Sequence, residues 1–369
     1  MKSQQKTNTL ILLMLCAIIL FFALSYIVLP TKSFSENENR LLQGVPKFTF
    51  SKLLDGTYTA QLHNYYSDQI NFRSHLVEMR AFCSLALGKN ENNGILLTSD
   101  GYLIDTHHYT GENYEHLQSN LSKIETLLQS FESKGVKAYS LIVPRKIDLL
   151  EEKVAGFYSS ERNKVAWGYV GKMHTPLLNT LQSAKENAFY KTDHHLSAEG
   201  TYRVYLALSE ALGFEPYSID KFDLITLTNE FFGTSYSKSG FFFTEPDKIR
   251  APKPQGDKYQ TTIVNLESFN GFYDYSYLDK KDKYATFLSG NNAHVKIEDT
   301  SEKKETVLLI KDSYAHALAP FLCEHYNIEL IDPRYFRGSI EKYAEKNDIK
   351  SVIFLFGLDT LASANISIK

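Results

Sequence analysis

Cysteine is scarce in this chain of 369 residues, which contains three. Cys16 lies inside an apolar N-terminal run, so only Cys83 and Cys323 are available for pairing in the remainder. Two cysteines do not make the dense network that stabilises a small disulfide scaffold. The sequence therefore excludes that class of fold, and it leaves open whether Cys83 and Cys323 pair.

A surplus of positive charge is also absent. Lysine and arginine number 40 against 43 aspartate and glutamate residues, which gives a formal net charge of -3. No basic stripe runs along the sequence. Because nucleic-acid binding depends on clustered positive charge, the sequence argues against nucleic acid as a partner.

The N-terminal run lacks two processing signals. No A-x-A cleavage site closes it, and Cys16 follows Met14 and Leu15 rather than the small residue of a lipoprotein signal. These absences favour an uncleaved signal anchor over a cleaved signal peptide, and whether the segment is cleaved stays open at this point.

The run itself extends over residues 11–29 without a charged residue. At a rise of about 1.5 Å per residue, its length roughly matches a bilayer hydrocarbon core of about 30 Å. Lys2 and Lys6 precede the run with no acid among them, whereas a mixed set of charges follows it. The positive-inside rule therefore predicts a single-pass protein of the cell membrane, with a cytoplasmic N-terminus and an extracytoplasmic remainder.

The rest of the chain is predicted to form one exported domain on a stalk. We assign residues 1–30 to the anchor, 31–56 to a polar stalk and 57–369 to the domain. Hydrophobic residues make up 43% of the chain and charged residues 22%, a composition that supports a packed core. Residues 213–300 are rich in Tyr, Phe, Gly, Pro and Thr, and we expect a β-rich insertion there.

Within the domain, helical and strand patterns alternate, which is typical of an α/β fold with a parallel sheet flanked by helices. The expected helices are 57–85, 113–133, two pieces within 157–184, 197–212, 315–325 and 340–345. The expected strands of the sheet are 136–143, 306–310, 328–331 and 351–356. We also expect a hairpin of 95–97 with 102–104, and antiparallel strands at 241–243 and 261–266 in the insertion.

Three residues carry the elements of serine chemistry. Asp193 and His195 are two positions apart after an apparent strand, so in an extended segment both side chains project to one side and His194 faces away. Ser313 lies where the strand 306–310 gives way to a helix, whose first amides can stabilise an oxyanion. A hydroxyl, an imidazole base and an orienting carboxylate are the requirements of nucleophilic acyl transfer.

Each of these signals has a simpler interpretation. A serine after a strand is more often a helix N-cap than a nucleophile. Asp193, His194 and His195 are also metal-ligand residue types, but a metal site needs further ligands, and the only other dense pair, His107-His108, lies in a different segment. We therefore predict no metal.

Several short motifs, in their order and spacing, resemble one known family. The motifs are Glu38-Asn39-Arg40, Tyr66-Ser67-Asp68 through Arg73, Asn93-Gly94 with Asp100-Gly101, Val143-Pro144, Asp193-His194-His195, Phe232-Gly233-Thr234, Asp312-Ser313-Tyr314 and Asp332-Pro333-Arg334-Tyr335. They resemble the DHHW protein family, which is similar to SGNH-hydrolase-like proteins that O-acetylate alginate and other exopolysaccharides. The resemblance covers essentially the whole exported part.

The resemblance implies a fold and a division of roles. It implies a circularly permuted SGNH-hydrolase-like (flavodoxin-like) sheet, in which the Asp and His precede the serine in sequence. Carried onto this chain, the motif makes Asp193 the orienting acid, His195 the general base and Ser313 the nucleophile. No cofactor is implied.

The chain departs from the family pattern at two places. Leu196 stands where the family has the tryptophan of its name, and Phe356-Gly357-Leu358-Asp359 offers no asparagine for the oxyanion hole. Gly233 or the amide of Tyr314 is the candidate donor instead. Arg334 and His194 are candidates for substrate binding, and Arg334 is equally well interpreted as a structural salt-bridge partner.

The resemblance implies serine-dependent O-acetylation of an extracellular or cell-wall polysaccharide. Relatives work beside a membrane-bound O-acyltransferase, which becomes a candidate partner. Water as the acceptor would make the same residues a carbohydrate esterase. The alternative from another class is a non-catalytic protein that binds glycan or scaffolds a surface polysaccharide assembly system, with a decayed site. The glycan, the acyl donor and the oligomeric state stay open.

Overall fold

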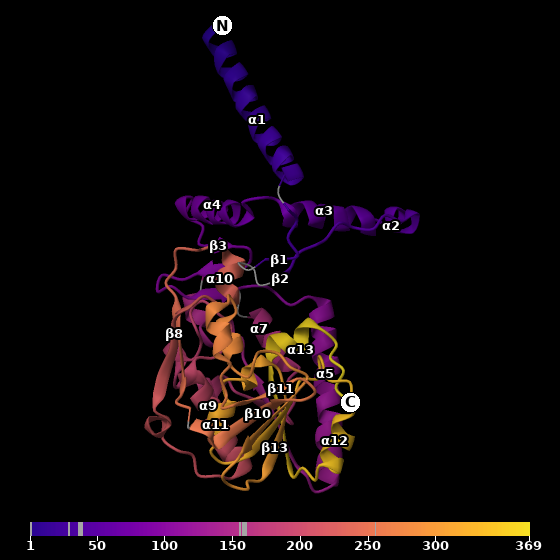
Figure 1. The fold of residues 1–369 in the computed structure, drawn as a ribbon, viewed down its shortest axis with the longest axis vertical. Coiled ribbons are helices and arrows are strands. Elements are labelled where there is room, and N and C mark those ends of the chain that lie inside the picture. The colour runs from indigo at the N-terminus through magenta and orange to yellow at the C-terminus, as the bar shows by residue number, and fades with distance from the viewer. Residues whose placement is uncertain (1, 29, 36–39, 155, 157–160, 255) are drawn as a thin grey trace. The chain divides into compact units, whose positions relative to one another are not determined.

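A computed structural model describes residues 2–28, 30–35, 40–154, 156, 161–254 and 256–369 (Figure 1). The chain separates into two compact units, which we call the N-terminal unit (residues 1–89 and 240–242) and the α/β unit (residues 90–239 and 243–369). Residues 57–89, which we expected to open the exported domain, belong to the N-terminal unit in this division. Residues Glu38 and Asn39 of one motif, and 157–160 of the expected helical pieces, lie outside the described residues.

The N-terminal unit is helical. The long helix α1 (Lys2–Val28) contains a segment, Gln4–Tyr26, with a mean hydropathy of 2.6 that is long and apolar enough to cross a membrane; it is the one such helix among the described residues. The helix expected over 57–85 is two helices, because the chain breaks at residues 70–72, where Phe72 has a φ of 61°. The other elements of the unit are β1 (Phe34–Ser35), β2 (Arg40–Leu41), α2 (Phe50–Leu54), α3 (Thr57–Gln69) and α4 (Arg73–Ala86).

A sheet of eight strands forms the centre of the α/β unit. Its order is β11-β10-β12-β14-β13-β15-β6-β7. The strands are β6 (Lys137–Val143), β7 (Thr175–Pro176), β10 (Tyr259–Ile263), β11 (Glu267–Asn270), β12 (His294–Asp299), β13 (Thr306–Lys311), β14 (Asn327–Ile331) and β15 (Ser351–Gly357). The five strands from β14 to β7 are parallel, as the alternating pattern predicted.

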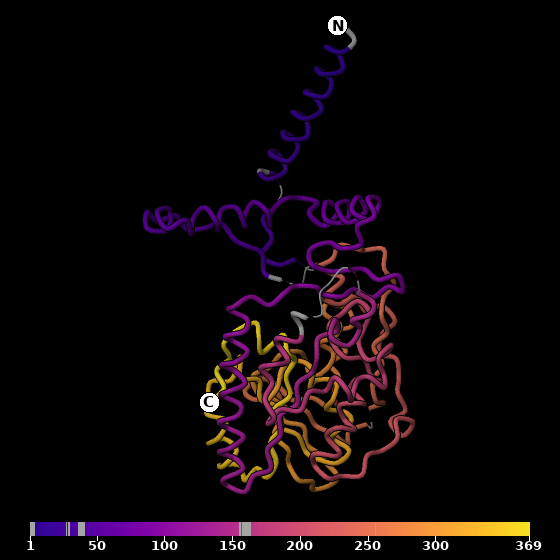
Figure 2. The backbone as a smooth tube through the Cα atoms, turned by 180° about the vertical axis from the view of Figure 1, so that it is seen from behind, coloured from indigo at the N-terminus to yellow at the C-terminus, as the bar shows by residue number. Residues whose placement is uncertain are grey.

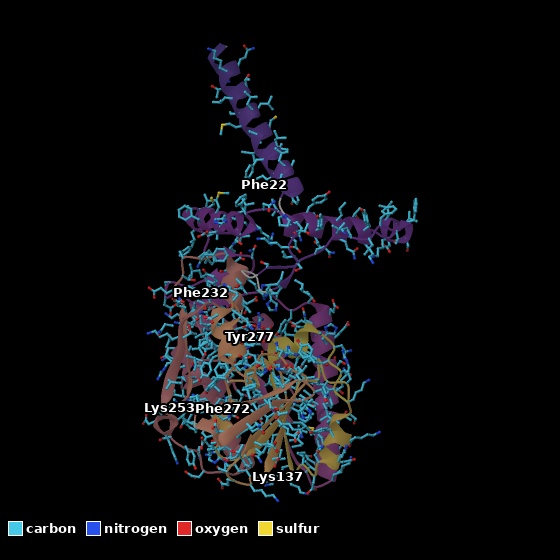
Figure 3. All side chains as sticks on the ribbon, viewed as in Figure 1. Phe22, Lys137, Phe232, Lys253, Phe272 and Tyr277 are labelled. Carbon is cyan, nitrogen blue, oxygen red and sulfur yellow. The ribbon has the colours of Figure 1, made fainter. Side chains whose placement is uncertain are left out.

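Helices cover both faces of this sheet, because its parallel strands are apolar on both sides. In β13, Val307 and Leu309 belong to one buried cluster, and Leu308 and Ile310 belong to the other. Figures 1 and 2 show the long helix α5 on one side of the sheet, and Figure 3 shows side chains filling the layers. The helices that line the second cluster are α5 (Gly111–Ser133), α7 (Glu161–Gly168), α12 (Ile340–Lys346) and α13 (Leu358–Ser363). The helices that line the first are α6 (Lys146–Leu149), α8 (Leu178–Gln182), α9 (Ala198–Leu212) and α11 (Ala319–Leu322).

The segment 213–300 is antiparallel, and part of it extends the main sheet. Strands β10, β11 and β12 pair antiparallel, and β12 joins β14. The expected strand at 241–243 is wrong, because residues 242 and 243 form a turn. Two further small sheets are β8 (Leu224–Phe231) with β9 (Asp247–Pro252), and β3 (Glu91–Asn92), β4 (Ile95–Leu97) and β5 (Leu103–Asp105). The second of these contains the hairpin that we expected, since β4 pairs with β5.

The helix expected over 315–325 is the largest local error. The chain instead forms the 3₁₀ turn η7 (Ser313–Ala315) and the short helix α11. Proline at position 320 lacks the backbone N–H that would continue a helix from the preceding turn, whereas it is well tolerated at the start of a new one. The remaining short elements are α10 (Thr234–Ser239), η1 (Glu151–Lys153), η2 (Lys185–Asn187), η3 (Ile219–Phe222), η4 (Gly256–Lys258), η5 (Tyr275–Asp279) and η6 (Lys283–Thr286).

Candidate active site

Ser313 lies at the carboxyl end of β13, the edge at which ligands bind in open parallel sheets. The preceding residue, Asp312, fixes the turn that presents it. The Asp312 carboxylate accepts hydrogen bonds from the amide of Tyr314 at 3.0 Å and from the amide of Gly357 at 2.8 Å. It thereby ties the end of β13 to the end of β15 and leaves the Ser313 side chain half-buried at the rim.

The Asp193-His194-His195 segment lies in a closed loop. Phe189 and Leu196 form an isolated antiparallel bridge across the base of the loop. The expectation of an extended backbone here is wrong, because the His195 amide donates a hydrogen bond to Asp193 Oδ1 at 2.9 Å and the backbone bends. An aspartate that accepts from the amide two residues later favours such a turn. Side chains two positions apart still converge, but through a turn rather than through strand alternation.

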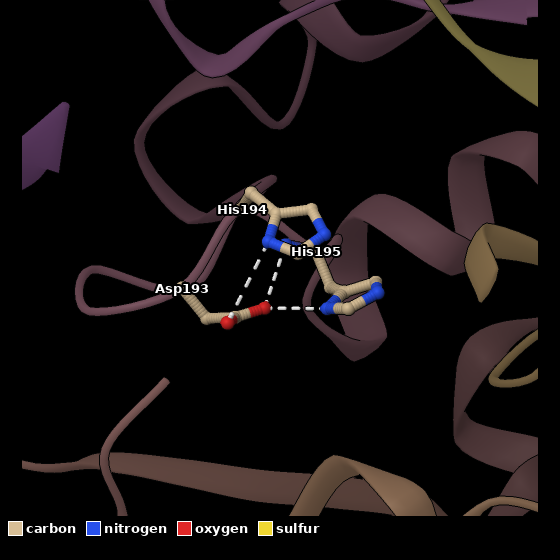
Figure 4. Close-up of side chains that lie close together, drawn as sticks. All are labelled: Asp193, His194 and His195. Atoms are coloured by element: carbon tan, nitrogen blue, oxygen red, sulfur yellow. Dashed lines mark hydrogen bonds and ion pairs between the residues drawn. The ribbon is translucent and has the colours of Figure 1, made fainter. Parts of the chain in front are cut away.

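The structure brings the three residues expected to act together into one chain of contacts. His195 Nδ1 lies 2.5 Å from Asp193 Oδ1, and His195 Nε2 lies 2.8 Å from Ser313 Oγ. Figure 4 shows the first of these contacts beside the His194 ring. Asp193 is 2% exposed and His195 7% exposed, so water screens the contact little. A hydroxyl at this distance from an imidazole nitrogen is within reach of proton transfer.

Asp193 is held as a carboxylate. Burial alone would raise its pKa, but the neighbouring imidazoles of His194 and His195, together with hydrogen bonds from His195 and Thr234, hold the pKa well below its ordinary value. The Thr234 amide donates to Asp193 Oδ2 at 2.7 Å and the Thr234 hydroxyl donates at 3.0 Å. An ionised acid opposite Nδ1 fixes the tautomer that leaves Nε2 free to accept a proton.

Gly233 makes this arrangement possible, because it lies directly against Asp193. A Cβ atom at position 233 would lie 2.1 Å from Asp193 Cβ and 2.3 Å from Asp193 Oδ2. No side chain other than hydrogen fits there without moving the carboxylate. Gly233 thus has a clear packing role, which the sequence did not predict.

We expect Gly233→Ala to lower both stability and activity. The displaced carboxylate should cost about 1–3 kcal/mol of unfolding free energy, the usual range for overpacking. Urea unfolding and turnover of a chromogenic acetyl ester measure the two effects. Gly168→Ala is the control, since nothing lies within 4 Å of its added Cβ. Equal stability and activity in both variants would contradict this role.

His194 does not face away from the site as the sequence suggested. Its ring centroid lies 4.0 Å from that of His195, and its Nδ1 lies 2.7 Å from Thr234 Oγ1. The bend in the loop, which replaces the expected extended backbone, places both rings on the same side. Its side chain is 45% exposed, so it stays available as a substrate contact. Although part of the ring reaches solvent, the dense packing around it desolvates the imidazole, and this desolvation together with the neighbouring His195 ring lowers the pKa of His194 to about 4.

This lowered pKa predicts a pH dependence of stability. Between about pH 6.5 and 4, an unfolded His194 binds a proton and the folded one does not, so stability falls as the pH falls. In His194→Asn that contribution disappears, and we expect a smaller loss of unfolding free energy between pH 7 and pH 5 than in the native chain. Urea unfolding at both pH values measures it. An equal loss in the two proteins would show that His194 titrates normally.

The two candidate oxyanion donors are already engaged. The amide of Gly233 donates to Thr192 Oγ1 at 3.2 Å, and the amide of Tyr314 donates to Asp312. Asp359, in the block where the family analogy sought an asparagine, carries an acceptor-only carboxylate that takes a hydrogen bond from Tyr109 at 2.6 Å. Among the described residues, none accepts a hydrogen bond from the backbone amide of Ser313 itself.

Arg334 has the geometry of a structural ion pair. Its Nε lies 2.9 Å from Asp332 Oδ1 and its Nη2 lies 2.6 Å from Asp332 Oδ2. The same aspartate lies 3.6 Å from the buried amine of Lys311, at the end of β13. Arg334 is therefore tied to the frame of the site, and its proposed contact with an anionic sugar stays a prediction.

Sequence reasoning missed one aromatic residue that covers the base. The ring of Tyr284, in η6, stacks on His195 with centroids 3.8 Å apart and planes 11° apart. Leu196, at the position of the family tryptophan, is instead buried in the core at 2% exposure. Tyr284 lies far from the motifs in sequence, and its only signal was membership of the aromatic-rich insertion.

The side chains of the same loop lie close enough together to bind a metal ion. One potential ligand atom each from Asp193, His194 and His195 lies within 4.8 Å of the others. In the His107-His108 pair, His107 instead contacts Asp105, with His107 Nδ1 2.6 Å from Asp105 Oδ1. A metal ion held by the three residues would compete with the contacts of His195 to Asp193 and Ser313, so the two uses of the loop exclude each other.

Comparisons with known proteins agree with this architecture. The family described as DHHW protein matches residues 117–331. A crystal structure of a DHHW family protein from Eubacterium siraeum shares 21% identity and has a TM-score of 0.60, covering 74% of this chain and 94% of that chain. Bacillus cereus PatB1, solved with a sulfonyl adduct, shares 17% identity and has a TM-score of 0.60, covering 74% and 98%. The O-acetyltransferase domain of Pseudomonas putida AlgJ shares 15% identity and has a TM-score of 0.46, covering 74% and 93%.

No curated protein matches the chain. The two structures with a TM-score of 0.60 show a shared fold at low identity. The family match spans more than half of the sequence and includes Asp193, His195 and Ser313. The chain therefore belongs to the DHHW protein family.

Proposed function

We propose that this protein is a membrane-anchored, serine-dependent acyltransferase that O-acetylates a polysaccharide outside the cytoplasm. The observation that carries the proposal is the chain of contacts from Asp193 through His195 to Ser313, at the carboxyl edge of a parallel sheet. The family resemblance supports acetyl transfer as the reaction and a glycan hydroxyl as the acceptor. It also supports the circularly permuted SGNH-like arrangement, with the acid and base before the serine.

The reaction has two covalent steps. His195 Nε2 takes the proton of Ser313 as Oγ attacks the carbonyl carbon of an acetyl donor, and the imidazolium then protonates the departing group. This leaves an acetyl ester on Ser313. In the second step His195 deprotonates an acceptor hydroxyl, which attacks the ester carbonyl, and Ser313 leaves with the proton from His195. Asp193 stabilises the imidazolium in both steps.

The negative charge that develops on the carbonyl oxygen needs hydrogen-bond donors. We propose the Ser313 amide as one, because it lies beside the nucleophile and the Gly233 and Tyr314 amides are already engaged. His194 and Arg334 stay candidates for contacts with the glycan.

The apolar helix α1 supports attachment to the cell membrane. Lys2 and Lys6 before it, with no acid among them, support an N-terminus in the cytoplasm and an α/β unit outside. A membrane-bound O-acyltransferase that delivers acetyl groups across the bilayer is the partner that the resemblance suggests. Water as the acceptor gives esterase activity from the same acetyl-enzyme, so transfer and hydrolysis share the first step.

An acetyl-enzyme experiment tests the proposal. The full chain in detergent, mixed with a chromogenic acetyl ester, should release about one chromophore per site in a rapid burst, as expected for a covalent intermediate. Peptide mass analysis should place the acetyl group on Ser313, and a sulfonyl fluoride, chosen because PatB1 was solved with a sulfonyl adduct, should block the burst. A slow reaction without a burst or an acetylated peptide would leave the glycan-binding alternative.

A further inference from the structure

Helix α4 exposes an apolar surface. Two large apolar side chains on it and the two that cap its ends have high exposed fractions: Met79 58%, Phe82 66%, the N-cap Phe72 54% and the C-cap Leu87 77%. Cys83 and Ala86 are exposed as well. At 3.6 residues per turn the positions within the helix lie on one side, and Phe72 and Leu87 flank the two ends of the helix. We call this set, Phe72, Met79, Phe82, Cys83, Ala86 and Leu87, the α4 stripe.

The residues of the α4 stripe are uncharged, and one exposed polar side chain, His75, lies between Phe82 and Ala86 on the same side of the helix. Arg73 and Arg80 lie along one border and Glu78 along the other, so the charges of the helix flank the stripe instead of covering it. The opposite side carries Val77, Ala81 and Leu85 together with two serines, and Ala81 there is fully buried. A helix that meets water on its outer side ordinarily carries polar residues there, so an apolar outer side indicates a second apolar partner.

Contacts within the N-terminal unit place the start of α4 beside the end of α1. Asn71 Nδ2 donates to Ser25 Oγ at 3.0 Å, and the rings of Phe72 and Phe21 stack with centroids 5.9 Å apart. The rings of Tyr66 and Tyr26 lie 5.8 Å apart. Phe72, the first residue of the stripe, therefore touches the last turns of the segment Gln4–Tyr26 that is apolar enough to span a bilayer.

We propose that α4 lies on the outer surface of the membrane, with the α4 stripe in contact with lipid. The inference rests on the membrane anchoring proposed above, because α1 then ends at the same surface where α4 begins. A helix with an apolar stripe between charged borders is typical of segments that lie at the boundary between headgroups and acyl chains.

The consequence is a membrane contact at two places. The spanning helix α1 alone would let the rest of the N-terminal unit tilt and rotate above the bilayer. Lipid contact along α4 would hold this unit flat against the surface, on the side of the membrane that an acetyl donor delivered through the bilayer reaches first.

The native cysteines allow a direct test in the full chain. Cys83 lies in the α4 stripe, Cys16 lies in α1, and Cys323 is buried and out of reach of a label. A thiol-reactive fluorophore is attached to Cys83 in the variant Cys16→Ser, and to Cys16 in the variant Cys83→Ser. The solvent control carries the label at position 303, in a variant that combines Lys303→Cys with Cys16→Ser and Cys83→Ser. The three proteins are reconstituted in vesicles of phosphatidylcholine and phosphatidylglycerol.

We expect a nitroxide lipid labelled near the headgroup to quench the Cys83 label at least about threefold more than the label at 303, as for an interfacial helix. Aqueous iodide should show the opposite order. If iodide quenched the Cys83 label as strongly as the label at position 303, the stripe would face water and the proposal would be overturned. If neither quencher reached the Cys83 label, protein would cover the stripe, and the proposal would also be overturned. Cys16 lies near the middle of the segment Gln4–Tyr26, about 15 Å from either headgroup layer, so a second nitroxide lipid labelled deep in the acyl chain is used to test it. Quenching of Cys16 by that lipid without headgroup quenching at Cys83 would keep the anchor and remove the α4 contact. The absence of both would also remove the anchor.

A pair of substitutions checks that the stripe itself makes the contact. Met79→Ser with Phe82→Ser changes two exposed residues, so the fold should persist. Lipid quenching at Cys83 should fall at least about twofold, because the apolar area that binds lipid is smaller. Glu78→Gln, at the border of the stripe, is the matched control and should leave the quenching unchanged. Equal quenching in the double variant and the control would contradict the proposal.

Discussion

Ser313→Ala should reduce turnover of a chromogenic acetyl ester by at least about 10³-fold, the scale seen when a catalytic serine is removed from a comparable triad. The variant keeps His195 and Asp193 but has no oxygen to carry the acetyl group. The burst of chromophore should disappear together with steady-state turnover. Stopped-flow absorbance measures both, and mass spectrometry of the intact chain measures acetylation.

The control for this variant is another serine whose hydroxyl bonds only locally. Ser133, exposed at the end of α5, donates to the Ser130 carbonyl at 2.7 Å. Ser133→Ala should keep native turnover, and both variants should unfold at the native temperature, because neither removes a core contact. Retention of turnover within about threefold in Ser313→Ala would exclude Ser313 as the nucleophile, since such a change is under 1 kcal/mol of transition-state stabilisation.

Most of the sheet was predictable because its strands are short continuous apolar runs. Each of β13 and β15 packs against helices on both faces, so no polar residue interrupts its central residues, and the pattern separates them clearly from amphipathic helices such as α5. The turn at Ser313 could be placed because three polar residues, Lys311, Asp312 and Ser313, end the apolar run of β13. What failed was the helix after it, where the effect of Pro320 on an otherwise apolar run was overlooked.

The residues of the site also fall into predictable and unpredictable ones. Asp193, His195 and Ser313 were found because their residue types define a chemistry, and the local order Asp-x-His survives a change from extended to bent backbone. Tyr284 and Gly233 were not assigned their roles. Their contribution is a close approach between segments distant in sequence, and neither a stacked ring nor a missing Cβ has a local pattern. The burial of Leu196 likewise depends on the tertiary packing around the loop.

Asp193→Asn should reduce turnover by on the order of 10³ to 10⁴, with little change in substrate affinity, as loss of the orienting acid does in a Ser-His-Asp site. In the native chain the Asp193 carboxylate accepts a hydrogen bond from His195 Nδ1 and so keeps the ring proton on that nitrogen. Nε2 is then free to accept the proton of Ser313. An amide can turn its NH₂ toward Nδ1, which favours the tautomer with the proton on Nε2. That nitrogen then donates to Ser313 instead of activating it, so the rate of acetylation falls while the binding surface stays in place.

The measurement that separates this effect from misfolding is the division between kcat and KM, together with the burst rate. We expect kcat and the burst rate to fall together, and KM to change by less than about threefold, because Asp193 is buried behind the base and does not reach the substrate. Asp257→Asn, an exposed carboxylate that accepts from Asn270 at 2.8 Å, is the matched control and should behave as the native chain. A variant at Asp193 with native kcat, or one whose whole loss lies in KM, would show that this carboxylate does not orient the base.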